Sequence, residues 1–377
     1  MQLLIAGDLV PKEVNVPLFN NADLKTLLGD DLLAIWLKAD IRIFNLETPL
    51  YNDHNPISKY GPNLQAPIST ITGIKALNPN LVTLANNHIL DHGVEGLKST
   101  VKILKEHNVP YVGVGRNVDE AKLPYIIQAK NKSIGVYACT EHEFSYAETN
   151  KAGANPFDIL EIFTEIKHLK TKTDYLVVLY HGGKELYQYP SPFLQKVCRK
   201  LILSGADLVV CQHSHCLGSY EVYHQGTIVY GQGNFIFNAH YNRELWNTSV
   251  IINLTIADMV KINYLPIIRT KNGVRMANEV ETKDILTSFY TRSNKLLIPD
   301  FIEKEYRKFA LKLVNNYLTK FAGFGKTLRR IDKYLLRGKL LKLKYPKKRK
   351  LALRNFIECE SHRELLLTGL KEENLNE

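Results

Sequence analysis

The chain has 377 residues, of which 45% are hydrophobic, so it can form one large domain with an appendage or two domains. No apolar run reaches the length of a membrane span, and the five cysteines lack a CxxC spacing, which favours reduced core thiols over a disulfide framework. The net charge of +11 is confined to one segment: residues 301–350 hold 17 Lys+Arg against 3 Asp+Glu, whereas residues 1–300 hold 29 of each sign. The first residues, MQLLIAGD, start a predicted strand without a basic or apolar leader, so we expect a cytoplasmic protein.

The first 265 residues alternate strand-like apolar runs with helical patterns. The runs LLIAG, IRIFN, LVTLA, YLVVLY and LVVC predict strands, and GTIVYGQGNFIF and SVIINLTI predict later ones. Helices are expected over residues 24–37, 93–107, 157–169 and 192–204. This alternation predicts an α/β layered fold. Gly231 and Gly233 indicate a tight passage of the backbone, and the polar, proline-bearing residues 51–70 predict a long loop near the site described below.

The pattern changes after residue 290. Apolar residues then recur at helical spacing among basic ones, as in Ile302, Tyr306, Phe309, Leu313 and Tyr317. We therefore expect one domain over residues 1–290 and a basic helical region over residues 291–377.

Side chains that can ligate a metal follow five of the strand-like runs. In chain order they are Asp8, Glu47, Asn87 with its neighbour His88, His181, and the pair His213 and His215. Taken singly, Asp8 is more typical of a turn or helix cap than of a metal ligand, whereas Asn87 with His88 is as typical of a polar loop as of a site. Because α/β sheets bind ligands beyond the carboxyl ends of their strands, the repetition predicts one shared metal site. Mixed imidazole and oxygen ligands favour Mn, Fe or Zn.

Two of these side chains suggest further roles. A carboxylate can bridge two cations, which is a chemical reason for placing Glu47 between metal positions. A histidine that does not bind metal can exchange a proton near neutral pH, and His88 is the candidate for this general acid or base. Cys211 and Cys216 flank the paired histidines, where we expect them to pack rather than to bind metal.

The succession GD, NLETPL, LANNHILDHG, HGGKE, GADLVVCQHSH and IVYGQGNFIF, which spans residues 1 to about 240, resembles the CapA family of capsule and poly-γ-glutamate synthesis proteins. That family is similar to the calcineurin-like metallophosphoesterases. The resemblance implies two facing β-sheets flanked by helices, with two divalent ions at their rim. It assigns Asp8 and His215 to one ion, Asn87, His181 and His213 to the other, and Glu47 as the bridge. It makes His88 the residue that protonates the leaving group, with Asp91 orienting its ring.

The sequence departs from the wider superfamily at two places and from the CapA family pattern at a third. The opening Asp-x-His pattern has Val10 at its third position, so the first ion has one ligand fewer. The bridging residue is Glu47 where the superfamily has Asp. The motif HGG at residues 181–183 replaces the HWG that is common in the family, which removes one aromatic side chain.

The resemblance implies a metal-dependent hydrolase in the synthesis or modification of capsule, poly-γ-glutamate or a related cell-envelope polymer. A metal-activated water would attack a phosphoester or a γ-glutamyl amide, and the substrate would be an anionic polymer or its precursor. The alternative is a non-catalytic interaction subunit of a membrane-associated polymer synthase, with a structural or vestigial metal site.

The basic residues 301–350 predict docking on an anionic partner. We favour the inner face of the membrane, or a polymer synthase there, because each basic residue near an anionic bilayer contributes about 1 kcal/mol. An acidic polymer is the next option. Nucleic acid is disfavoured because no recognition motif accompanies the charge. The oligomeric state is left open.

Overall fold

The computed structural model describes residues 1–238, 244–257 and 259–375. The chain forms two compact units, Met1–Glu303 and Lys304–Glu377. The boundary expected near residue 290 falls inside helix α9 (Glu279–Lys295), whose Phe289 is fully buried. The first unit therefore continues beyond that position to Glu303.

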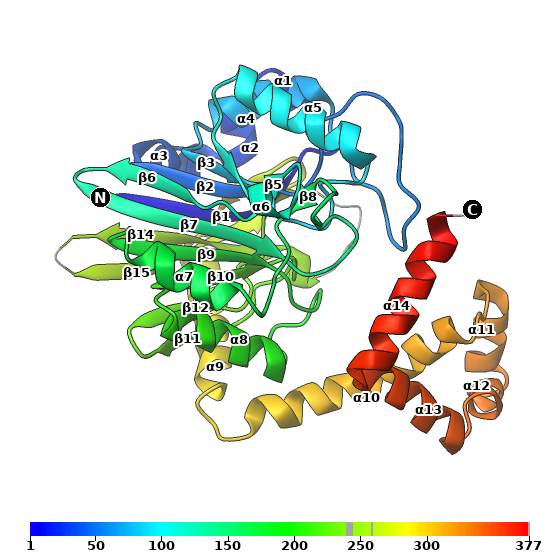
Figure 1. The fold of residues 1–377 in the computed structure, drawn as a ribbon. Helices are drawn as coiled ribbons and strands as arrows, with labels where there is room; N and C mark the ends of the chain where they lie inside the picture. The colour runs from blue at the N-terminus through cyan, green and yellow to red at the C-terminus, as the bar shows by residue number, and fades with distance from the viewer. Residues whose placement is uncertain (239–243, 258, 376–377) are drawn as a thin grey trace. The chain divides into compact units, whose positions relative to one another are not determined.

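Two β-sheets form the first unit (Figure 1). The larger sheet has the order β16-β15-β14-β1-β2-β3-β4, with β13 also paired to β1. Strands β1, β2, β3, β4 and β13 are parallel to one another, whereas β14 is antiparallel to β1, and the pairs β14–β15 and β15–β16 are antiparallel too. The strand bounds are β1 Gln2–Val10, β2 Ile41–Leu46, β3 Leu81–Thr83, β4 Tyr111–Val112, β13 Asn234–Phe237, β14 Thr248–Ile256, β15 Val260–Arg269 and β16 Val274–Met276.

The second sheet has the order β11-β12-β10-β9-β7-β6. Its four central strands are parallel, and a hairpin closes each edge. The bounds are β6 Tyr125–Ala129, β7 Lys132–Thr140, β9 Tyr175–His181, β10 Leu208–Gln212, β11 Tyr220–Tyr223 and β12 Gly226–Val229. A separate pair joins β5 (Val114–Gly115) to β8 (Gly153–Ala154).

Alternation of side chains along the strands builds a core on both faces of each sheet. Leu3 and Ile5 of β1 face the core between the two sheets, whereas Leu4 and Ala6 face the helices outside the larger sheet. These helices are α1 Val16–Asn20, α2 Leu24–Leu28, α3 Asp30–Lys38, α4 Ile71–Ala76 and α5 Gly93–Glu106. On the second sheet, Val209 faces outward against α7 (Ile162–Lys170) and α8 (Pro192–Leu203). The short α6 (Val118–Ala121) contacts β5 and β8. This layering, visible in Figure 1, confirms the predicted two-sheet α/β fold.

Two predicted helices differ from the observed ones. The helix expected over residues 24–37 is split into α2 and α3 at Gly29, whose φ of 70° no regular helix accommodates. The helix expected over residues 157–169 begins only at Ile162, because Pro156 bridges to Thr140 and the Phe157 amide donates to the Thr140 carbonyl at 2.8 Å. The predicted tight passage at Gly231 and Gly233 is confirmed by φ values of 135° and 77°.

The second unit is entirely helical over its described residues. Its helices are α10 Phe301–Phe321, which starts in the first unit, α11 Lys326–Tyr334, α12 Lys339–Lys344, α13 Lys347–Glu358 and α14 Glu360–Leu375 (Figure 1). Asp332 accepts hydrogen bonds from the amides of Leu340 and Leu341, at 2.9 and 3.3 Å, and so fixes the start of α12. The helical character expected for this region is observed.

Candidate metal centre

The parallel strands carry the predicted ligands to one end of the first unit. Asp8 lies near the end of β1 and Glu47 directly after β2, while His181 is the last residue of β9. His213 and His215 follow β10. Because β1 and β2 are parallel, as are β9 and β10, the carboxyl ends of each pair point to the same rim.

Glu47 lies at the centre of this group. Its Oε1 is 3.2 Å from Nε2 of His181 and 3.8 Å from Nε2 of His215. One ligand atom each from Glu47, His213 and His215 lie within 4.8 Å of one another, so a single cation could contact all three.

The remaining predicted ligands surround the same centre. The carboxylate of Asp8 is 3.4 Å from Nδ1 of His215 and 3.9 Å from Nδ1 of His181. Oδ1 of Asn87 is 3.1 Å from Nε2 of His181. The structure therefore brings all six predicted ligands into one buried cluster, while their roles as metal ligands stay predictions.

Unsatisfied polar atoms test whether a cation fits this cluster. Both carboxylate oxygens of Glu47 and Nδ1 of His213 are buried without a hydrogen bond; the contact of Glu47 with His181 lacks hydrogen-bond alignment. A buried carboxylate without a partner is costly unless an ion compensates its charge. The donor set of carboxylates, imidazoles and an amide oxygen suits a divalent transition metal, so the residues fit such an ion.

The backbone of the HxH motif is strained. His213 and His215 have φ values of 76° and 52°, in the left-handed region that non-glycine residues seldom adopt. Such strain is typical of functional sites, where the surrounding structure holds a side chain in a required direction. Here it directs both rings toward Glu47.

Burial and mutual charge shift the titration of the cluster. Burial lowers the pKa of His213 well below its usual range, and the nearby His181 and His215 rings lower it further. Burial acts in the same direction on His215, but the carboxylates of Glu47 and Asp8 raise its pKa to about 9. Asp8 has a lowered pKa, because hydrogen bonding to His215 and the charge of His181 outweigh the effect of its burial.

His88 and Asp91 form a pair beside the cluster. Nδ1 of His88 lies 2.6 Å from Oδ2 of Asp91, so Nε2 is the ring nitrogen left for other partners. Lys59 completes the group: its Nζ forms an ion pair with Oδ1 of Asp91 and lies 3.4 Å from Nδ1 of His88. Lys59 belongs to residues 51–70, whose predicted proximity to the site is thereby observed.

Several supporting residues were not predicted from the sequence. Asn45 donates to Oδ1 of Asp8 at 2.8 Å and contacts Nδ1 of His181 at 3.3 Å, and Oδ1 of Asn234 lies 2.9 Å from Nδ1 of His215. Glu143 accepts from Nδ2 of Asn87 at 2.9 Å. Two of them had a sequence signal: Asn45 lies two residues before Glu47 near the end of a strand-like run, and Asn234 lies within the motif IVYGQGNFIF.

The departure at Val10 has a visible structural counterpart. Val10 packs with Leu64, Phe237 and Trp246 in a small apolar cluster. The ring centre of Trp246 lies 4.5 Å from the ring centre of His215, so an aromatic wall lines this side of the site although residues 182–183 supply none. An apolar cluster thus occupies the place where the superfamily pattern has a histidine.

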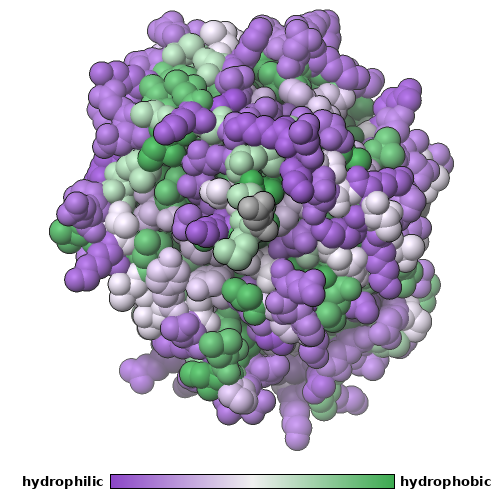
Figure 2. Space-filling view, turned by 90° about the vertical axis from the view of Figure 1, so that its left-hand side faces the viewer, coloured by the Kyte–Doolittle hydropathy of each residue, from purple (hydrophilic) through white to green (hydrophobic). Residues whose placement is uncertain are grey.

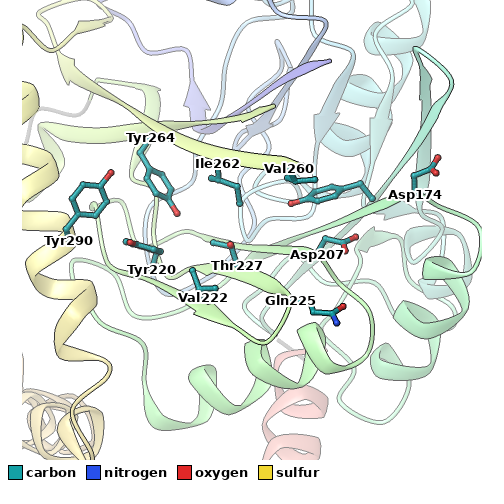
Figure 3. A pocket seen from close by; sticks show the side chains of 11 residues that line it. Asp174, Asp207, Tyr220, Val222, Gln225, Thr227, Val260, Ile262, Tyr264 and Tyr290 are labelled. Carbon is teal, nitrogen blue, oxygen red and sulfur yellow. The ribbon is translucent and has the colours of Figure 1, made fainter. Parts of the chain in front are cut away.

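A separate groove lies away from this centre. It has a volume of about 580 Å³ and is formed by β15, the β11–β12 hairpin and α9, with Tyr220, Tyr264 and Tyr290 along its wall (Figure 3). Asp207, also in the wall, already accepts from Nζ of Lys170 at 2.6 Å and from the Leu176 amide at 2.7 Å. The groove contains no member of the predicted site.

The end of the first unit at which β1 begins is mainly hydrophilic, with separate apolar patches (Figure 2).

Comparison with known proteins identifies relatives of this chain. Residues 2–239 match the profile described as bacterial capsule synthesis protein PGA_cap. The chain is 31% identical over 233 residues to the capsule biosynthesis protein CapA of Bacillus anthracis, which covers 58% of this chain and 57% of that protein. It is 29% identical over 214 residues to the PGA biosynthesis protein CapA of Bacillus subtilis strain 168, with 55% and 56% covered. The chain thus spans little more than half the length of these relatives.

Solved structures also show some similarity. The NAD nucleotidase of Haemophilus influenzae aligns with a TM-score of 0.41 and 13% identity, covering 77% of this chain and 56% of that chain. Residues 2–239, which match the family profile, contain every strand-end motif from Asp8 to His215. The two CapA proteins are relatives of this chain, and the predicted resemblance is therefore confirmed. The chain belongs to the bacterial capsule synthesis protein family PGA_cap.

Proposed function

We propose that this chain is a metal-dependent hydrolase that acts on a capsular, poly-γ-glutamate or related surface polymer, or on its precursor. The observation that carries this proposal is the buried carboxylate of Glu47, which has no hydrogen bond and is surrounded by His181, His213 and His215. A buried anion among imidazoles is the expected state of a metal site.

The family pattern suggests how two ions would be held. Asp8 and His215 would hold one ion, His181, His213 and Asn87 the other, and Glu47 would contact both. Bound divalent cations supply Lewis acidity, which makes water more acidic and stabilises negative charge that develops on a phosphoryl or acyl oxygen. Mn, Fe and Zn are the metals that this donor set favours.

The protein's own part in the reaction is to move a proton. Hydrolysis adds water across a P–O or C–N bond, and the leaving oxygen or nitrogen must take up a proton. Nε2 of His88 is the donor, because Nδ1 is engaged by Asp91 at 2.6 Å and the ring is thereby held in one orientation.

Basic side chains near the cluster favour an anionic substrate. Burial lowers the pKa of Lys12, while the carboxylates of Glu13 and, to a smaller extent, Asp91 and Glu47 oppose that shift, so its ammonium group lies within electrostatic range of the site. The pKa of His213 is lowered mainly by burial and by the neighbouring imidazoles, and the charge of Lys184 makes a further, smaller contribution. Both lysines can attract a phosphate or γ-carboxylate, which supports the substrate class named above.

The test is elemental analysis of the purified chain, followed by assays on phosphoesters and γ-glutamyl peptides. We expect about one to two transition-metal ions per chain and their loss in Glu47→Gln and His213→Ala. His88→Ala should keep the metal and lose about 10²–10⁴-fold in turnover. His168→Ala, an exposed histidine in the last turn of α7, is the matched control and should change neither quantity.

A metal-free chain, or a His88→Ala variant that loses metal as completely as His213→Ala, would contradict the proposal. A second candidate function rests on Val10, whose apolar cluster removes one ligand from the first ion. In that case the chain is an interaction subunit of a polymer synthase with a structural metal. Retention of metal without hydrolysis of any phosphoester or γ-glutamyl peptide would favour this second function.

A further inference from the structure

The second unit exposes most of its apolar side chains. Among the described residues from Lys304 onward, sixteen large apolar side chains are exposed, whereas only Leu318 and Leu341 are buried. Leu335 and Leu343 are 76% and 77% exposed. A helical unit with so little buried apolar surface gains little stability from its own packing, which indicates that another surface covers these side chains.

The exposed apolar residues form stripes on individual helices. On α10, Leu311, Val314, Tyr317 and Phe321 are exposed and recur at intervals of three or four residues, which places them on one face. These four side chains therefore form one continuous apolar face along the helix.

Helix α11 combines an apolar stripe with dense positive charge. Leu328, Ile331 and Tyr334 recur at intervals of three and are exposed. Among the basic residues of KTLRRIDKY, Lys326 precedes this stripe, and Arg329, Arg330 and Lys333 stand between its members. A basic helix with one apolar face is the form that lies in the headgroup region of a bilayer.

The charge of the whole segment decides among the surfaces that could cover it. Residues 301–350 hold 17 Lys+Arg against 3 Asp+Glu. A second copy of the same unit would bring like charges together, which is unfavourable. A soluble acidic polymer or a nucleic acid would neutralise the charge but would leave the apolar stripes in water.

We propose that the second unit docks on the surface of an anionic lipid bilayer, with its apolar stripes among the acyl chains and its Lys and Arg side chains at the lipid headgroups. Such a surface satisfies both features at once. No helix in the described parts of the chain is both long and apolar enough to cross a membrane. This inference is independent of the proposed hydrolase activity.

The test uses the full chain and vesicles of phosphatidylglycerol mixed with phosphatidylcholine, compared with vesicles of phosphatidylcholine alone, in a co-sedimentation assay. We expect binding to the anionic vesicles that weakens as salt is raised. The variant Lys326→Gln, Arg329→Gln, Arg330→Gln and Lys333→Gln should bind about 600-fold more weakly, because each of the four basic residues contributes a factor of about five.

A second variant separates apolar from electrostatic contributions. Tyr334→Ser, Leu335→Ser and Leu343→Ser keep every charge and remove exposed side chains only, so circular dichroism should be unchanged. Binding should fall by about tenfold or more, because apolar burial is lost. The matched control neutralises four exposed lysines of the first unit, Lys25, Lys98, Lys102 and Lys130, and should bind as the unchanged chain does.

Three results would overturn the inference. One is equal binding by the control and the fourfold α11 variant. Another is binding to soluble poly-γ-glutamate or nucleic acid without binding to anionic vesicles. The third is an apolar variant that converts an oligomer to a monomer while vesicle binding stays unchanged.

Discussion

At the residue scale, the site depends on buried charges that balance one another. The side chains of Lys59 and Asp91 are 1% and 0% exposed, and their ion pair adjoins His88. Breaking a buried pair by removing one partner leaves the other charge uncompensated, which costs far more than losing a surface pair. Lys59 is therefore a positioning residue, because it holds Asp91, which in turn orients His88.

We predict that Lys59→Met lowers the free energy of unfolding by roughly 3 kcal/mol, measured by urea denaturation. Lys98→Met is the matched control: its ion pair with Glu95 spans 2.8 Å, but both side chains are more than 60% exposed, so a loss of about 0.5 kcal/mol or less is expected. Equal losses in the two variants would show that the Lys59 pair contributes no more than a surface pair.

At the scale of elements, the close approach of β1 and β13 positions one side of the site. The two strands are parallel, with Asp8 opposite Asn234, and Asn234 contacts Nδ1 of His215. A Cβ atom on Gly7 would collide with the carbonyl oxygen of Gly233, which is backbone and cannot turn away. Only glycine at position 7 allows this spacing.

We predict that Gly7→Ala lowers the free energy of unfolding by about 1–3 kcal/mol, because β13 must move to accommodate the methyl group. Metal content should fall too, since the shift separates Asp8 from His215. Gly325→Ala is the control, because a Cβ there meets no atom within 4 Å. The prediction fails if thermal denaturation and elemental analysis give the same values for Gly7→Ala as for the unchanged chain.

At the scale of the whole molecule, the first unit contains its own core. Every residue of the four apolar clusters lies between Leu3 and Ile302. Leu296 and Ile302 are 6% and 3% exposed in the cluster outside the second sheet, and Nε of Arg292 donates to the Gly218 carbonyl at 2.8 Å. Residues 291–303 therefore contribute to the stability of the first unit.

We predict that a chain ending at Glu303 keeps a thermal midpoint within about 2 °C of the full chain. A chain ending at Tyr290 loses Leu296 and Ile302 from the core and should melt roughly 10 °C lower. Differential scanning calorimetry distinguishes the two. If both shortened chains melt at the same temperature, residues 291–303 do not belong to the first core.

The sequence by itself determined most of the strands and helices, and it determined which strand ends carry the candidate metal ligands. A buried strand is recognisable from a few consecutive residues, so the side chains from Asp8 to His215 could be placed at strand ends, and parallel strands share an edge. The α/β layering and the helical second unit followed from the same local patterns. The break at Gly29 was missed, because a glycine within a helical pattern is often tolerated.

Only the tertiary structure decided which side chains meet across the chain. Lys59 reaches Asp91 over 32 positions and Asn45 reaches His181 over 136, and no local pattern contains such pairings. The same holds for Trp246 beside His215 and for the extension of the first unit to Glu303. The physical reason is that local propensity depends on neighbours in sequence, whereas these contacts depend on sheet register and loop closure, which involve the whole fold.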